Sequence, residues 1–348
     1  MTTPTEERPD AERGERRRTA FGLELSIDPR ISIPELGCCP DSALTPPSRI
    51  RLDTDELYRR WHTLTTTPER VREIRIGETL LRAIDFAEPA GYLLWVRDYG
   101  RVLISPDGLE LLCEPDPVNA DWATILSAQA LPLAATLRGL EVMHASGVVL
   151  DGMAVLVTGQ SGAGKSSLAA ALVKAGGQLL SDDAVALQLC DGALIAHAGS
   201  VALQLRTAED ERLSADERAT LGRPASSVEN KRRYVSNEAV DAAPLGCVFL
   251  LERSAEEPTV EQLGAVNPFE LIASTFNLSV RTPDRLQRQL DVVSAIASDG
   301  LAHRLRVQPG VDASRLGTIV HEHLRREAVP AEPALSGVHS RRERLLEL

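Results

Sequence analysis

Residues 159–167 combine glycines, a lysine and two serines at a spacing that suits phosphate binding. They read Gly-Gln-Ser-Gly-Ala-Gly-Lys-Ser-Ser, a complete P-loop motif. The glycines let backbone N–H groups turn inward toward phosphates. Lys165 would bring a positive charge to the β- and γ-phosphates, and Ser166 a hydroxyl to Mg²⁺. The motif predicts a site for ATP and Mg²⁺ made of Gly159, Gln160, Ser161, Gly162, Ala163, Gly164, Lys165, Ser166 and Ser167.

Two adjacent carboxylates, Asp182 and Asp183, follow the short apolar run 178–181. In P-loop proteins an acidic residue near the nucleotide holds the magnesium ion, although Asp pairs also cap turns. Consecutive side chains of a strand point in opposite directions, so one carboxylate could face the metal and the other an incoming hydroxyl. We expect Asp182 to be the general base and Asp183 to lie on the metal with Ser166. The sequence also allows the reverse assignment.

His144 precedes a predicted β-hairpin. Asp151-Gly152 separates the apolar runs 147–150 and 153–158, and Asp-Gly at such a place is a strong two-residue turn signal. The second strand leads directly into the P-loop, so the hairpin would return His144 to the phosphates. A histidine there could hydrogen-bond the γ-phosphate or orient the aspartates. Taken alone, a histidine before an apolar strand is more often structural.

The elements around the motif occur in the order that a P-loop requires. Residues 153–158 form an apolar run typical of a buried strand. Residues 167–174 are rich in helix formers and stop at Gly176-Gly177. The N-terminus of this helix would add its positive end to the anion site. Further along, residues 245–251 predict a strand, and Thr282-Pro283 predicts the start of a helix with an apolar face of Leu286, Leu290, Val293 and Ala297.

Together, His144-Ala-Ser, the hairpin, the P-loop and Leu-Leu-Ser-Asp-Asp resemble the catalytic domain of HPr kinase/phosphorylase. They resemble the divergent HPr-kinase-related serine kinases more closely still, over roughly residues 138–190. The resemblance implies an α/β P-loop kinase fold of the HPr-kinase C-terminal type, preceded by a small, mixed, sheet-rich module. It also implies ATP-dependent phosphorylation of a serine on a peptide or protein. The implied site residues are His144, Lys165, Ser166, Asp182 and Asp183.

Two departures from that family pattern bear on the substrate. The family places a Glu directly after the P-loop serine, where this chain has Ser167. Its later Glu-x-Arg-Gly signature is replaced by 201–206, which ends in Gln-Leu-Arg. These differences argue against HPr itself as the acceptor and against the reverse phosphorolysis reaction. Two alternatives stay open: a small-molecule kinase of the same fold, and an inactive nucleotide-binding adaptor, which Ser167 favours and the intact aspartates oppose.

Composition narrows the partners. The chain of 348 residues has a net charge of −12, from 38 basic and 50 acidic residues, which argues against nucleic acid. It has no apolar run near the roughly 20 residues that span a bilayer, and it does not open with an apolar signal segment. An odd number of cysteines and a P-loop favour reduced thiols and a cytoplasmic location. The family resemblance also makes a homo-oligomer an open option.

The chain is expected to divide into four parts. Residues 1–20 predict a disordered tail, 21–120 a small mixed or β-rich module, 121–326 the P-loop ATP-binding domain, and 327–348 a loose tail. Within the first module, 91–96 and 101–105 predict strands, with a turn at 105–108. Residues 122–140 predict a helix interrupted at Pro132. The segment around 231–234 predicts either a solvated loop or a mobile segment in which Lys231 or Arg233 stabilises phosphoryl charge.

Overall fold

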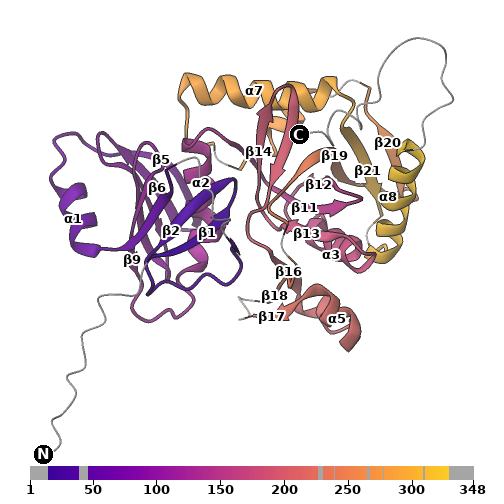
Figure 1. The fold of residues 1–348 in the computed structure, drawn as a ribbon, viewed down its shortest axis with the longest axis horizontal. Helices are drawn as coiled ribbons and strands as arrows, with labels where there is room; N and C mark the ends of the chain where they lie inside the picture. Colours follow the sequence, from indigo (N-terminus) through magenta and orange to yellow (C-terminus); the bar gives the residue numbers. More distant parts are fainter. Residues whose placement is uncertain are drawn as a thin grey trace, which may run out of the picture.

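The computed structural model describes residues 15–38, 46–225, 230–238, 240–264, 267–276, 278–308 and 310–328. Over these residues the chain forms two nine-stranded sheets and one three-stranded sheet. Figure 1 shows the first sheet at the left and the helix-covered second sheet at the right. The predicted fold class, α/β with a sheet-rich N-terminal region, is confirmed.

The first sheet has the strand order β3-β1-β2-β4-β9-β8-β7-β6-β5. Its strands are β1 (Arg16–Ala20), β2 (Leu23–Ile27), β3 (Gly37–Cys38), β4 (Ser48–Leu52), β5 (Glu69–Ile76), β6 (Thr79–Ala87), β7 (Gly91–Val96), β8 (Gly100–Ile104) and β9 (Glu110–Pro115).

The predicted tail over 1–20 was wrong at its C-terminal end. Residues 16–20 form β1, which pairs antiparallel with β2. Strand β2 provides the hydrogen-bond partners that the backbone groups of these residues need. Residues 1–14 lie outside the described part. The strands predicted at 91–96 and 101–105 are β7 and, shifted by one residue, β8. The predicted turn between β8 and β9 is confirmed, because Gly108 N–H donates to the Ser105 oxygen at 2.9 Å.

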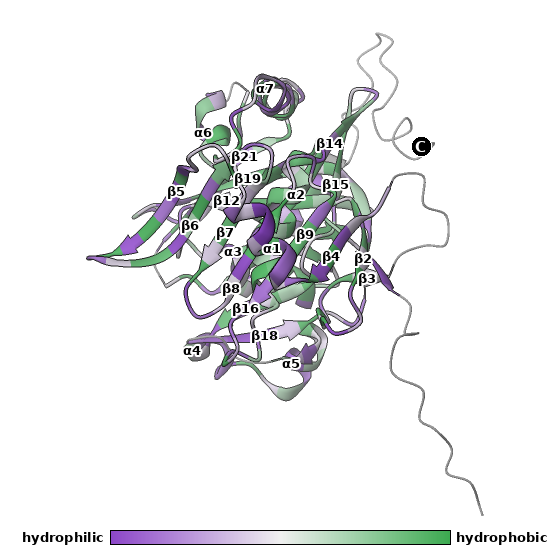
Figure 2. Cartoon of the chain, turned by 90° about the vertical axis from the view of Figure 1, so that its left-hand side faces the viewer, coloured by the Kyte–Doolittle hydropathy of each residue, from purple (hydrophilic) through white to green (hydrophobic). Residues whose placement is uncertain are grey.

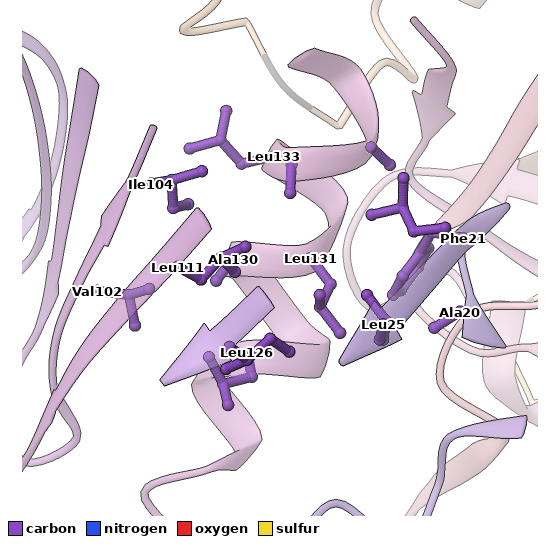
Figure 3. Packing of buried hydrophobic residues seen from close by; sticks show 14 of the residues in the cluster. Ala20, Phe21, Leu25, Val102, Ile104, Leu111, Leu126, Ala130, Leu131 and Leu133 are labelled. Carbon is purple, nitrogen blue, oxygen red and sulfur yellow. The ribbon is translucent and has the colours of Figure 1, made fainter. Parts of the chain in front are cut away.

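Each face of the first sheet is covered by a helical segment. Successive side chains of β8 alternate, so Val102 and Ile104 pack against Leu126 and Leu131 (Figure 3), while Leu103 packs on the other face against Leu57. Leu57 is the buried residue of α1 (Thr54–His62), whose remaining surface is largely hydrophilic (Figure 2). Side chains of the second sheet join the first cluster, so the two halves share a core.

The predicted helix at 122–140 is shorter and begins irregularly. It consists of a π-helical turn η1 (Leu126–Ala130) and α2 (Leu131–Leu137). Pro132 lies in the first turn of α2. Because proline has no N–H to donate to the preceding turn, the wider π-turn accommodates it without an additional break.

The second sheet carries the P-loop. Its main path is β10-β14-β15-β19-β12-β11-β13, and β21 joins β19 to β20. Its strands are β10 (Glu141–Met143), β11 (Ala145–Leu150), β12 (Met153–Gly159), β13 (Gln178–Ser181), β14 (Val185–Cys190), β15 (Ala193–His197), β19 (Ala242–Arg253), β20 (Thr259–Gln262) and β21 (Ala302–Val307). Strand β12 runs parallel to β19 and antiparallel to β11.

Helices cover both faces of this sheet. Val155 and Val157 of β12 pack toward α3 (Lys165–Lys174) and α8 (Ala313–Ala328), whereas Ala154 and Leu156 pack toward α7 (Pro283–Ser298). This alternation explains why β12 reads as a continuous apolar run, since a strand buried on both faces has no polar side. A short helix α6 (Pro268–Ile272) packs against α7.

The start of α7 was predicted correctly, and its apolar face was predicted correctly for Val293 and Ala297 but not for Leu286 and Leu290. Thr282 caps the helix by accepting from Arg285 N–H. Leu286 and Leu290 are each 47% exposed, and the buried positions are instead Arg285, Gln289, Val292, Val293 and Ile296. The reason is a polar contact: the buried Arg285 guanidinium bonds Glu141 at 2.8 Å and turns that side of the helix inward.

The segment 207–236 is ordered around a small sheet rather than forming a solvated loop. Strands β16 (Ala202–Arg206), β18 (Lys231–Val235) and β17 (Arg223–Pro224) pair antiparallel, beside α4 (Thr207–Asp210) and α5 (Ala215–Leu221). Residues 226–229 lie outside the described part. At the C-terminus, α8 continues to residue 328, past the predicted boundary at 327, and 329–348 are not described. In the part of the chain that the structure describes, every helix is too short or too polar to cross a membrane.

Candidate active site at the P-loop

The P-loop joins β12 to α3, as the motif predicts. Gly162 and Gly164 have φ angles of 78° and 111°, in the left-handed region that favours glycine. Lys165 opens the helix and is buried. Its Nζ donates to the backbone oxygens of Gly159 at 3.0 Å and Gln160 at 3.4 Å. Burial lowers the pKa of Lys165, and the nearby aspartates oppose that shift.

The predicted hairpin forms and places His144 next to the loop. Strands β11 and β12 pair from Leu150 with Met153 to Ala145 with Thr158, with Asp151 and Gly152 in the turn at positive φ. Thr158 Oγ1 donates to the His144 backbone oxygen at 3.1 Å. The start of β11 and the end of β12 therefore lie at the same edge of the sheet, where the P-loop begins.

Asp182 lies beneath the P-loop and is 5% exposed. Its Oδ1 accepts from Ser146 Oγ at 2.6 Å, Ser166 Oγ at 3.0 Å and the Asp183 N–H at 3.1 Å. Its Oδ2 accepts from the Gln204 N–H at 3.0 Å. Burial raises the pKa of the Asp182 carboxyl against these hydrogen bonds, and the charge of Asp183 adds to the rise. The charged carboxylate therefore accepts several hydrogen bonds but is poorly solvated by water. A nearby cation would stabilise this charged form.

Asp183 has the opposite environment. Its side chain is 45% exposed, and its φ of 78° lies in the left-handed region that aspartate tolerates. His144 Nδ1 is 2.9 Å from the Asp183 backbone oxygen and 3.2 Å from its Oδ1. Both of these atoms are acceptors, so Nδ1 is the nitrogen that donates here. The predicted divergence of the two neighbouring carboxylates is therefore present.

Cationic side chains border the loop. Arg253 Nη2 donates to the Gly162 oxygen at 3.4 Å. A Cβ placed on Gly162 would lie 3.3 Å from the Arg206 guanidinium, which therefore lies against the loop. Arg206 is paired in register with Lys231 across β16 and β18, and the charge of Lys231 acts on Lys165.

Arg233, the alternative phosphate ligand predicted from the sequence, is held in a buried ion pair. It is 7% exposed, and its guanidinium bonds Glu35 at 2.9 Å. Lys231 and Arg232 at the start of β18 are exposed, whereas the strand is buried from Arg233 onward. The sequence predicted a solvated loop or a mobile segment here, and neither implies a buried arginine.

A carboxylate also stands beside the last residue of the motif. Ser167 Oγ donates to Glu209 Oε2 of α4 at 2.8 Å. Where the family that this motif resembles carries a glutamate, this chain has Ser167. Ser167 in turn binds a glutamate of the later helix α4. The sequence gave no signal of this contact, because the two residues are 42 positions apart.

Three pockets meet at His144 and Asp183. One of about 560 Å³ is lined by Gly159, Gln160 and His144, on the nucleotide-loop side. Two others, of about 340 and 260 Å³, are lined by Asp183 and by side chains of the first sheet. Of the P-loop, Gly159 and Gln160 line the first pocket, and no residue of 159–167 lines either of the other two.

Two groups in this site had no predicted role. Ser146 donates the shortest hydrogen bond to Asp182, and the Gln204 backbone N–H donates to its other oxygen. A serine within the apolar strand β11 was an available signal, since a buried hydroxyl needs a partner. A backbone N–H leaves no signal in a sequence.

Residues 136–205 match the family model described as the HPr Serine kinase C-terminal domain. An HPr kinase/phosphorylase of Clostridium botulinum (strain Eklund 17B / Type B) is 41% identical over 71 residues, 20% of this chain and 23% of the relative. One from Clostridium beijerinckii is 27% identical over 187 residues, 54% of this chain and 57% of the relative. Residues 136–205 of this chain are therefore HPr-kinase-like.

The HPr-kinase-like segment contains His144, the P-loop and both aspartates, and it ends just before Arg206. The chain spans less than two thirds of the length of the curated relatives it matches, from 23% to 57%. Among solved structures, the Hpr(Ser) kinase/phosphatase from Coxiella burnetii is 16% identical, with a TM-score of 0.30 over 54% of this chain and 99% of that one.

Proposed function

We propose that this chain, with its HPr-kinase-like segment, is an ATP-dependent kinase that phosphorylates a hydroxyl, namely a serine of a peptide or protein. The observation that carries the proposal is the contact of Ser166 with Asp182, with Asp183 and His144 exposed beside it. A site that only binds nucleotide has no need of the second, exposed carboxylate. The relatives' name, HPr kinase/phosphorylase, supports the same reaction class.

The geometry favours the reverse of the roles expected for the two aspartates. Asp182 is buried and its oxygens already accept four hydrogen bonds, so it has little access to an acceptor hydroxyl. Asp183 is exposed toward the outer pockets and can accept a proton. We therefore assign Asp183 as the general base and Asp182 as the carboxylate on the metal side.

The residues present fit Mg²⁺, since Ser166 Oγ and Asp182 Oδ1 are hard oxygen donors 3.0 Å apart beside the phosphate loop. When bound there, the ion would neutralise charge on the β- and γ-phosphates. Lys165 would turn from the loop carbonyls to the phosphates, and Arg206 and Lys231 would stabilise the equatorial oxygens. The acceptor oxygen forms a bond to the γ-phosphorus, its proton passes to Asp183, and the bond to the leaving ADP breaks.

One observation bears on the adaptor alternative, and another on the cellular location. The adaptor alternative relied on Ser167, but Glu209 supplies a carboxylate at that position. The described cysteines Cys113, Cys190 and Cys247 form no disulfide with one another, which is compatible with the cytoplasmic location that ATP use suggests.

The test is release of γ-phosphate from ATP and its transfer to a pool of serine peptides. Lys165→Ala should lose nucleotide binding. Asp183→Asn should bind Mg²⁺–ATP but lose transfer by about 100-fold or more, because a general base contributes on that order. Asp151→Asn is the matched control, since this exposed turn residue precedes a glycine and Asn-Gly forms the same turn. Tight ATP binding with no release or transfer above the Asp183→Asn level would favour the adaptor.

A further inference from the structure

Two arginines of the first sheet face the Asp183–His144 pair. Arg72 of β5 pairs with Ile84, and Arg82 lies two residues from Ile84 on β6. Residues that pair across strands or lie two apart on one strand share a face of the sheet, so both guanidinium groups project from the same side. They line the pocket of about 340 Å³ together with His144 and Asp183.

Within the described residues, the two arginines have polar but uncharged partners. Arg82 donates to the Gln129 side-chain oxygen, and Arg72 donates to the Phe276 backbone oxygen at 3.2 Å. Burial lowers the pKa of Arg82, the neighbouring charge of Arg72 lowers it further, and Asp183 partly offsets both. Two cations close together and partly desolvated are stabilised when an anion joins them.

The other arginines of this hairpin are satisfied differently. Arg70 forms an ion pair with Asp85, and Arg75 forms one with Glu73 at 3.0 Å. The hairpin therefore pairs its remaining cations internally and leaves Arg72 and Arg82 directed at the pocket.

The position of the pocket tells which ligand the arginines would meet. Gly159 and Gln160 of the P-loop line the pocket on the other side of His144. The pocket of Arg72 and Arg82 is lined by no residue of 159–167. Asp183 therefore stands between the nucleotide loop and the arginine pair. An anion on these arginines would belong to the molecule that approaches the base, not to ATP.

We infer that Arg72 and Arg82 bind an anionic group, a carboxylate or a phosphate, carried by the acceptor close to the hydroxyl that receives the phosphoryl group. The inference rests on the proposed kinase function. Guanidinium groups suit such oxyanions because they donate two parallel, charge-assisted hydrogen bonds. The adjoining pocket of about 260 Å³, which Arg82 and Asp183 also line, offers Val96, Tyr99 and Ile125 to an apolar part of the same acceptor.

The test uses three pools of serine peptides, identical except that the residues flanking the serine are Asp, Asn or phosphoserine. Binding is measured with Mg²⁺ and a non-hydrolysable ATP analogue, and transfer is measured with labelled ATP. For the wild type we expect the Asp or the phosphoserine pool to bind about 10-fold or more tightly than the Asn pool. Whichever pool binds more tightly identifies the anion as carboxylate or phosphate.

The ratio of the affinity for the preferred charged pool to that for the Asn pool should fall toward one in Arg72→Gln and Arg82→Gln. It should stay unchanged in the control Arg75→Gln. Arg82→Lys, which keeps the charge, should retain part of the preference and guards against loss of folding in Arg82→Gln. Equal binding of the Asp, Asn and phosphoserine pools, an equal loss in Arg75→Gln, or a loss of ATP affinity in place of peptide affinity would overturn the inference.

The same experiment separates this inference from the kinase function. Transfer to the Asn pool at the rate of the charged pools would support the kinase function and contradict the anion subsite. Preferred binding of a charged pool without any transfer or phosphate release would support an anion-binding site at Arg72 and Arg82 and contradict the kinase function.

Discussion

At the scale of single residues, the site depends on how one buried carboxylate is held. Asp182 accepts four hydrogen bonds, and two of them come to its Oδ1 from hydroxyls on β11 and at the start of α3. The pair of aspartates and the P-loop were visible in the sequence because their spacing is local. The different environments of the two aspartates were not visible, because they depend on Ser146 and on Gln204, which reach Asp182 from 36 and 22 residues away.

Ser146→Ala should destabilise the protein by roughly 1–3 kcal/mol, because it leaves a buried carboxylate with fewer donors. The loss should be greater at pH 8 than at pH 4. Removing a donor to the charged form raises the already raised pKa of Asp182, so the folded state becomes less stable as pH rises. Urea denaturation at both pH values measures this, with the exposed Ser298→Ala of α7 as control. A change equal to that of the control would contradict the role given to Ser146.

At the scale of elements, local signals were read well and side-chain direction was not. The Asp-Gly turn, the glycine loop and the Thr-Pro helix start each lie within a few residues, and each formed where expected. The inward face of α7 was misjudged because Arg285 is buried by a contact with Glu141, 144 residues away. Amphipathic spacing cannot register a buried charge pair, since it treats every charged residue as exposed.

The contact between β21 and α8 should make stability depend on pH. His303 is buried and lies 3.0 Å from His323, and burial together with His323 lowers the pKa of His303 to about 4. In the unfolded chain its pKa is about 6.5, so below that value the unfolded state binds a proton that the folded state does not. This contribution is fully present above pH 6.5 and is lost as pH falls toward 4, up to about 3 kcal/mol.

The measurement compares the free energy of unfolding of wild type and His303→Gln between pH 7 and pH 4. We expect the advantage of the wild type to shrink over that range. His62→Gln, at an exposed histidine of α1, should keep a constant difference. A constant difference for His303→Gln as well would show that the histidine pair is not the source of the pH dependence.

At the scale of the whole molecule, a buried ion pair joins the N-terminal sheet region to the small three-stranded sheet. Glu35, 2% exposed, bonds Arg233 at 2.9 Å and also accepts from Ser127 Oγ at 2.9 Å. This contact links the N-terminal sheet to the small sheet that carries Arg206 and Lys231. The sequence could not predict it, because neither residue belongs to a motif and the two are 198 positions apart.

Glu35→Gln should cost about 3–5 kcal/mol, because it leaves the buried Arg233 without its counter-charge. The double variant Glu35→Met with Arg233→Met should cost less than the sum of the two single changes, since it leaves neither charge unpaired. Guanidinium denaturation provides the comparison. Glu257→Gln, in the exposed pair with Arg315, should cost less than about 1 kcal/mol. Additive costs in the double variant would mean that the pair is not coupled.

The burial of Phe21 has a consequence for the order of events during synthesis. Its N–H donates to the Ala198 oxygen, and its ring packs so closely on Gly199 that a Cβ there would lie 2.4 Å from it. The ribosome adds roughly 5–20 residues per second, so about 10–40 seconds separate the emergence of Phe21 from that of Ala198 and Gly199. For that interval the nascent N-terminal sheet carries an uncovered aromatic ring, and a chaperone that recognises such a surface would meet this chain before its nucleotide loop exists.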